Sequence, residues 1–92
     1  MAVTRINHFE AKQETTERLY SFMQDMVTKV RMLPGCRSVK LLRSTENPAR
    51  FAVVEEWDSI EAHQKAATTI PPADLEKAKS LVARPPAGEY FQ

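Results

Sequence analysis

The sequence predicts an α+β fold, a ferredoxin-like β-α-β-β-α-β unit with an antiparallel sheet. Three observations predict it. Between residues 19 and 33, apolar side chains recur every three or four residues, as on one face of an amphipathic helix. Residues 51–54 read Phe-Ala-Val-Val, an apolar run typical of a buried strand. A short turn at Asn47-Pro48 joins residues 36–44 to residues 50–57, and so short a connection favours an antiparallel pair.

The first half of the chain supplies a strand and the long helix. Residues 2–11 are expected to form the first strand, with alternate side chains on opposite faces. Thr15 or Thr16 is a suitable N-cap for the helix, because a threonine hydroxyl accepts from the free amides of a first turn. Pro34-Gly35 then ends the helix.

The second half supplies two shorter helices and a last strand. Asp58 is expected to cap a helix over residues 59–68, with Glu61 reaching back to complete a capping box. Two prolines interrupt the helical pattern, and a second short helix is predicted at 73–82. Residues 89–92 are long enough only for a short last strand.

Composition narrows the class of protein. With 92 residues, the chain is expected to form one domain over residues 1–92. A net charge of +1 with interspersed basic and acidic residues argues against a nucleic-acid or membrane partner. The only cysteine, Cys36, rules out an internal disulfide, and no cluster of ligand residues predicts a metal. No signal peptide or spanning segment is recognisable, which predicts a cytoplasmic protein.

The third strand has an unusual pattern, since both of its faces are apolar. Phe51 and Val53 share one face, and Ala52 and Val54 share the other. The helices of such a fold cover only one face of the sheet, so a second copy of the chain is needed to cover the other. The pattern therefore predicts a homodimer, a dimeric α/β barrel. The alternative is a monomer with one partly apolar, wetted sheet face.

Side-chain parity brings several functional candidates into one space. Asn7 shares a strand face with Phe9, and Trp57 shares one with Val53. His63 enters the same space from the second helix. We predict a pocket whose catalytic residues are His63, as a base, and Asn7, which orients or stabilises a substrate oxygen. The residues predicted to bind substrate are Trp57, Phe9, Phe22 and Val53.

Each of these residues also has a purely structural interpretation. For Trp57 the more usual role is an ordinary core residue. His63 is equally consistent with a half-exposed surface histidine, and Asn7 with an edge residue that bonds locally. His8 has the opposite parity to Asn7, so we expect it at the dimer face. Cys36 is expected to be a small apolar residue rather than a nucleophile.

Four segments, in their order and spacing, resemble the antibiotic biosynthesis monooxygenase (ABM) family of dimeric α+β barrels. The resemblance spans nearly the whole chain and implies a ferredoxin-like homodimer. For some members it also implies cofactor-independent oxygenation of electron-rich phenols, anthrones or quinols, in which the substrate anion itself reduces O₂. The segments are RINHFEAK (5–12), LPGCRS (33–38), FAVVEEWDSIEAH (51–63) and IPPADL (70–75).

The known catalytic sets of the family match only in part. The haem-degrading branch pairs residues matching Asn7 and Trp57 with a histidine at the position of Ala67, and His63 lies one helical turn earlier. The anthrone-oxidising branch resembles the chain at Trp57 but has an asparagine where Val53 stands. Two hypotheses follow. One is a cofactor-free monooxygenase acting on a small aromatic, anthrone-like or quinol-like substrate. The alternative is a non-catalytic dimeric module, stress-associated or binding a small ligand.

Overall fold

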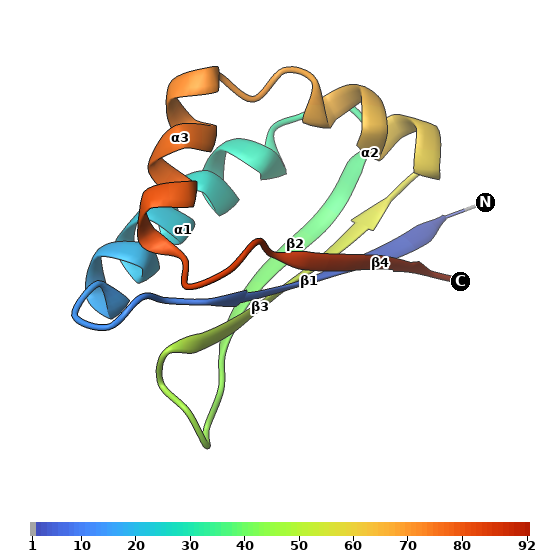
Figure 1. Ribbon diagram of the computed structural model, residues 1–92. Helices are drawn as coiled ribbons and strands as arrows, with labels where there is room; N and C mark the ends of the chain where they lie inside the picture. The colour runs from blue at the N-terminus through green and yellow to red at the C-terminus, as the bar shows by residue number, and fades with distance from the viewer. Residues whose placement is uncertain (1) are drawn as a thin grey trace.

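The strands form one antiparallel sheet with the spatial order β2-β3-β1-β4. The computed structural model describes residues 2–92, and Figure 1 shows its three helices together on one face of the sheet. This arrangement confirms the α+β class and the ferredoxin-like order, with the second crossover helix divided in two. The strands are β1 (Val3–Glu10), β2 (Cys36–Arg43), β3 (Arg50–Trp57) and β4 (Ala87–Phe91).

The long helix, α1 (Thr16–Arg31), forms where the apolar spacing predicts it. Leu19, Phe22 and Met23 are buried against the sheet. Thr15 is the N-cap residue, but its hydroxyl donates to the carbonyls of Lys12 and Leu81 instead of capping the helix amides. The hydroxyl therefore joins the start of α1 to the end of the last helix.

The second helix, α2 (Ile60–Ala67), is capped by a different residue from the one predicted. Ser59 has extended backbone angles and is the last residue before the helix, so its Oγ accepts from the Ala62 amide at 3.0 Å. Asp58 lies one residue too early, and its carboxylate accepts from Arg37 at 2.7 Å on the surface. The predicted capping box of Asp58 and Glu61 is therefore wrong, and a serine cap replaces it.

The chain then forms α3 (Pro72–Leu81) and returns to the sheet as β4, which begins two residues earlier than predicted. Leu81 is buried in the core, whereas Leu75 is 48% exposed. The sequence places both on one apolar face of α3, and for Leu75 this holds only in part, because about half of its side chain is exposed. Within residues 2–92, no helix is long and apolar enough to cross a membrane.

Strand β3 is central to the sheet, and its side chains alternate as expected. Phe51, Val53 and Trp57 are buried under the helices. On the other face, Ala52 and Val54 are only half-buried in the single chain. The same alternation makes Glu55 face the helices, between Val53 and Trp57, and this glutamate is buried.

Candidate functional site

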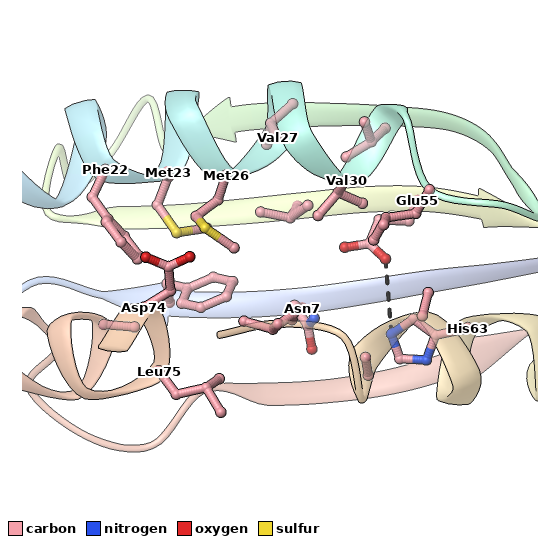
Figure 2. Close-up of a pocket in the computed structure, with 18 of the residues that line it drawn as sticks. Asn7, Phe22, Met23, Met26, Val27, Val30, Glu55, His63, Asp74 and Leu75 are labelled. Carbon is pink, nitrogen blue, oxygen red and sulfur yellow. Dashed lines mark ion pairs between the residues drawn. The ribbon is translucent and has the colours of Figure 1, made fainter. Parts of the chain in front are cut away.

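A cavity of about 170 Å³ lies between α1, the α2–α3 segment and the helix-covered face of the sheet. Figure 2 shows it as an elongated space, with Asn7 near its middle and Glu55 and His63 at one end. Most of its wall is apolar, which is usual for a small-molecule site. The lining residues are Asn7, Phe9, Phe22, Met23, Met26, Val27, Val30, Leu33, Val39, Val53, Glu55, Trp57, His63, Ala66, Ala67, Ile70, Asp74, Leu75 and Ala78.

All six site residues predicted from the sequence line this one cavity, although their roles stay predictions. Strand register explains part of this, because Asn7 on β1 lies directly opposite Val53 on β3. Trp57 is 1% exposed and packs in the core, as its structural interpretation states. It also forms part of the cavity wall. Phe9, Phe22 and His63 complete the predicted set.

His63 is held inside the cavity by two aromatic neighbours. Its side chain is 16% exposed, so it is not a surface histidine. Its Nδ1 lies 2.6 Å from the Tyr90 hydroxyl, and its ring meets Trp57 edge-on at 5.3 Å between centroids. Burial, and then the positive charge of Arg5, lower the pKa of the imidazole below its ordinary value of 6.5. His63 is therefore neutral at pH 7 and has a lone pair available as a base.

Glu55 belongs to the site, and our sequence-based set omits it. It is 7% exposed, and its Oε1 accepts a hydrogen bond of 2.7 Å from the Trp57 indole. The same oxygen lies 3.9 Å from His63 Nε2, the pair joined by the dashed line in Figure 2. Burial raises the pKa of the Glu55 carboxyl, and the Trp57 hydrogen bond and Arg5 oppose this only in part. The sequence does contain a signal for Glu55, because residues 53, 55 and 57 of one strand point to the same face.

Tyr90 and Arg5 form a second layer behind His63. The Arg5 guanidinium lies 4.6 Å from the centre of the Tyr90 ring, in a cation–π contact. Arg5 Nε is buried and has no hydrogen-bond partner within residues 2–92. Gly88 makes this packing possible, because a Cβ at that position would overlap Asn7 Oδ1 and the Arg5 guanidinium. Strand β4 thus supports both the histidine and the amide.

The opposite end of the cavity is also acidic. Figure 2 places Asp74 and Leu75 of α3 there, away from Glu55 and His63. Asp74 forms an ion pair of 3.7 Å with Lys29 of α1. None of the described lining residues is a lysine or an arginine. The cavity wall therefore carries carboxyl groups at both ends, which disfavours an anionic ligand.

Metal and thiol chemistry have little support in the described part of the chain. Residues 2–92 contain no group of three or more His, Cys, Asp or Glu side chains placed to hold a metal ion. Cys36 is half-buried, and burial together with the charge of Glu55 raises the pKa of its thiol. A thiol whose pKa is raised is a poor nucleophile at neutral pH.

The fold and cavity define a small ferredoxin-like domain with an internal ligand-sized pocket. Residues 2–69 match the family model of antibiotic biosynthesis monooxygenases, and the chain belongs to this family. The matched region contains Asn7, Glu55, Trp57 and His63, whereas Tyr90 lies beyond it. No curated protein matches the chain by sequence.

Solved structures show the same fold at low sequence identity. Rv0793 from Mycobacterium tuberculosis is 22% identical with a TM-score of 0.86, and the match covers 100% of this chain and 94% of that one. A protein of Nitrosomonas europaea from the same family is 18% identical with a TM-score of 0.90, covering 98% and 88%. SnoaB from Streptomyces nogalater, a cofactor-independent oxygenase in a mutant form, is 18% identical with a TM-score of 0.81, covering 99% and 91%.

Proposed function

We propose that the protein is a cofactor-independent monooxygenase acting on a small aromatic, anthrone-like or quinol-like substrate. The observation that carries this proposal is the neutral imidazole of His63 facing an apolar cavity that also contains the Asn7 amide and the Trp57 indole. Family membership supports the reaction class, and one structural relative, SnoaB, is itself a cofactor-independent oxygenase.

The proposed reaction begins with a proton transfer. His63 removes a proton from the hydroxyl or activated CH of the substrate, and the Asn7 amide donates a hydrogen bond to the oxyanion that forms. The resulting electron-rich anion passes one electron to O₂, and the two radicals combine into a peroxide. Return of the proton and loss of water leave a new carbonyl, so the substrate and O₂ give the quinone and water. Trp57 and the apolar wall hold the flat ring and exclude solvent.

Oxygen uptake by the purified protein tests this proposal. With a panel of hydroquinones and anthrones, we expect uptake above the autoxidation rate, and a fall of about 10²- to 10⁴-fold in His63→Ala, as for loss of a general base. Gln64→Ala is the matched control, because Gln64 is the exposed neighbour of His63 on α2. Because the pKa of His63 is lowered, the rate in wild type should rise with pH along a limb centred below pH 6.5.

Uptake equal to autoxidation across the panel would contradict the proposal. In that case the alternative, a non-catalytic small-ligand-binding module, would be the better description. Uptake that persists in His63→Ala would contradict the role of His63 as the base.

We also propose that residues 1–92 act as one domain within a homodimer formed through the open sheet face. Ile6, Ala52 and Val54 lie on that face, and Leu42 and Phe91 beside them are each 45% exposed. A second copy placed sheet to sheet would cover them and complete a dimeric α/β barrel. The free Cys36 thiol is consistent with the cytoplasmic location that we propose.

A further inference from the structure

We propose that Glu55 and His63 together bind one hydroxyl group of an uncharged phenol or quinol, which makes Glu55 a substrate-binding residue. This inference rests on the proposed function for the identity of the cavity, and it adds the chemistry by which the substrate is recognised. It is drawn from the 3.9 Å separation between Glu55 Oε1 and His63 Nε2, both of which line the cavity.

The separation is too long for a direct hydrogen bond and suits a shared partner. An oxygen atom about 2.8 Å from each of the two groups would see them at an angle of about 90°, which a hydroxyl oxygen accommodates. The other nitrogen of His63 is already occupied, because Nδ1 lies 2.6 Å from the Tyr90 hydroxyl. Nε2 is therefore the atom of His63 that faces Glu55 and remains available for a ligand.

The proposal assigns one proton to each group. With the Nδ1 proton of His63 directed at the Tyr90 hydroxyl, Nε2 accepts the proton of the ligand hydroxyl, and the protonated form of Glu55 donates to a lone pair of the same oxygen. Burial favours the uncharged form of both groups, since it raises the pKa of Glu55 and lowers the pKa of His63. The charged and titratable groups nearby are Arg5 on β1, Tyr90 on β4 and Cys36 at the start of β2.

The rest of the cavity selects against charge. Asp74 at the far end is the other acidic lining residue, and no lysine or arginine among the described lining residues offers a counter-ion. A carboxylate or phosphate on the ligand would therefore be buried without a partner. The site fits a flat, neutral aromatic molecule whose hydroxyl points towards Glu55 and His63.

Anaerobic calorimetry with three probes tests the inference without any turnover. The probes are 2-naphthol, its methyl ether 2-methoxynaphthalene, and 2-naphthoate. Wild type should bind the naphthol about ten- to a hundredfold more tightly than the ether, because the ether offers no proton to His63. The naphthoate should bind more weakly than the naphthol. Equal affinities for naphthol and ether, or a preference for naphthoate, would overturn the inference.

Matched variants locate the recognition. In Glu55→Gln the amide oxygen takes the place of Oε1 to keep the Trp57 hydrogen bond, so the atom that faces His63 carries no proton. The lost donor serves naphthol and ether alike, and we expect both to bind about tenfold more weakly relative to naphthalene, a reference probe without oxygen. His63→Ala removes the acceptor that only naphthol uses, and the preference for naphthol over ether should fall about tenfold. Glu61→Gln and Gln64→Ala are the controls, since both residues are exposed on α2, the helix that carries His63, and they should keep the affinities and the preference.

Unchanged affinities for naphthol and ether in Glu55→Gln would overturn the inference, as would an equal loss of naphthalene affinity, which would make Glu55 a structural residue. The two proposals fail separately. A protein that binds naphthol through Glu55 and His63 but consumes no oxygen would refute only the oxygenase. A protein whose oxygen uptake depends on His63, but whose probe affinities ignore Glu55, would refute only the hydroxyl site.

Discussion

At the scale of single residues, the site depends on burial acting oppositely on an acid and a base. Removal from water disfavours the charged form of any group, so it raises the pKa of Glu55 and lowers that of His63. Both are thereby held nearer to their uncharged forms. Arg5 acts differently, because its positive charge lowers the pKa of both groups and so opposes the effect of burial only at Glu55.

Removing the Arg5 charge should therefore raise the pKa of His63. In Arg5→Met, an uncharged side chain replaces the guanidinium that packs on Tyr90, and the repulsion of an imidazolium is lost. The measurement is an NMR titration of the imidazole CH signals of His63. Arg50→Met, an exposed strand arginine, is the control. A His63 pKa that stays at its wild-type value would show that burial alone sets it.

Glu55 should make stability depend on pH with an unusual sign. A carboxyl whose pKa is raised by folding contributes stability below its unfolded pKa of about 4.5, and this contribution is lost as pH rises through the folded pKa. Glu55→Gln should therefore gain stability relative to wild type as the pH rises from about 4.5 to neutrality. The gain is about 1.4 kcal/mol for each unit by which folding raises the pKa of Glu55.

Urea unfolding across this pH range measures the difference, with Glu56→Gln as the control. His63 acts in the opposite sense in both proteins, because its lowered pKa contributes stability above pH 6.5 that is lost as pH falls through the folded pKa. A constant difference between Glu55→Gln and wild type at all pH values would contradict the raised pKa.

Single residues also show how much of the candidate site can be predicted from the sequence. Strand alternation was sufficient to bring Asn7 and Trp57 into one space, and applied to the next inward position it also identifies Glu55. Tyr90 was out of reach, because it lies 27 residues after His63 and its position depends on the register of β4. No local pattern encodes that register. Gly88, which leaves room for Asn7 and Arg5, has meaning only once β4 is paired.

At the scale of elements, α2 carries His63, and its position is fixed at its first turn. Gly35, at the turn between α1 and β2, has a φ of +87° and would bring a Cβ to 2.8 Å from Ala62 Cβ. Because Gly35 has no Cβ, the first turn of α2 packs directly against this turn, next to the Ser59 cap. The sequence located the helix correctly but not its cap, because Asp58 and Ser59 both suit an N-cap and only the backbone angles decide between them.

The cap assignment predicts different costs for two adjacent substitutions. Ser59→Ala removes the acceptor of the Ala62 amide and should destabilise the protein by about 1 kcal/mol. Asp58→Ala removes only an exposed, solvent-screened ion pair with Arg37 and should cost less than loss of the cap. Denaturant unfolding at low and high salt separates them, since only the Asp58 effect should shrink with salt. If Asp58→Ala cost more stability at high salt than Ser59→Ala does, Asp58 and not Ser59 would be the residue that caps α2.

At the scale of the whole molecule, the sheet has one covered face and one open face. Figure 1 shows the helices together over one face. Glu55 and Trp57 belong to this face and are buried. The open face repeats an apolar pattern across strands, since Ile6 lies opposite Val54 and Ala52 lies opposite Leu42. The sequence already predicted this face from β3 alone, because two-sided apolar character is a local property of a strand. The cover that we propose is a second copy of the chain, and no local pattern in one strand encodes that contact.

A charge at the centre of the open face should separate the proposed dimer. In Val54→Glu, a carboxylate would be buried between two sheets without a partner, at a cost of several kcal/mol, whereas in a monomer it would be solvated. Sedimentation equilibrium should give a dimer mass for wild type and a monomer mass for the variant. Gln64→Glu, on the exposed side of α2, adds the same charge and should remain dimeric. A monomeric wild type would refute the dimer, and a dimeric Val54→Glu would show that the chains meet through another surface.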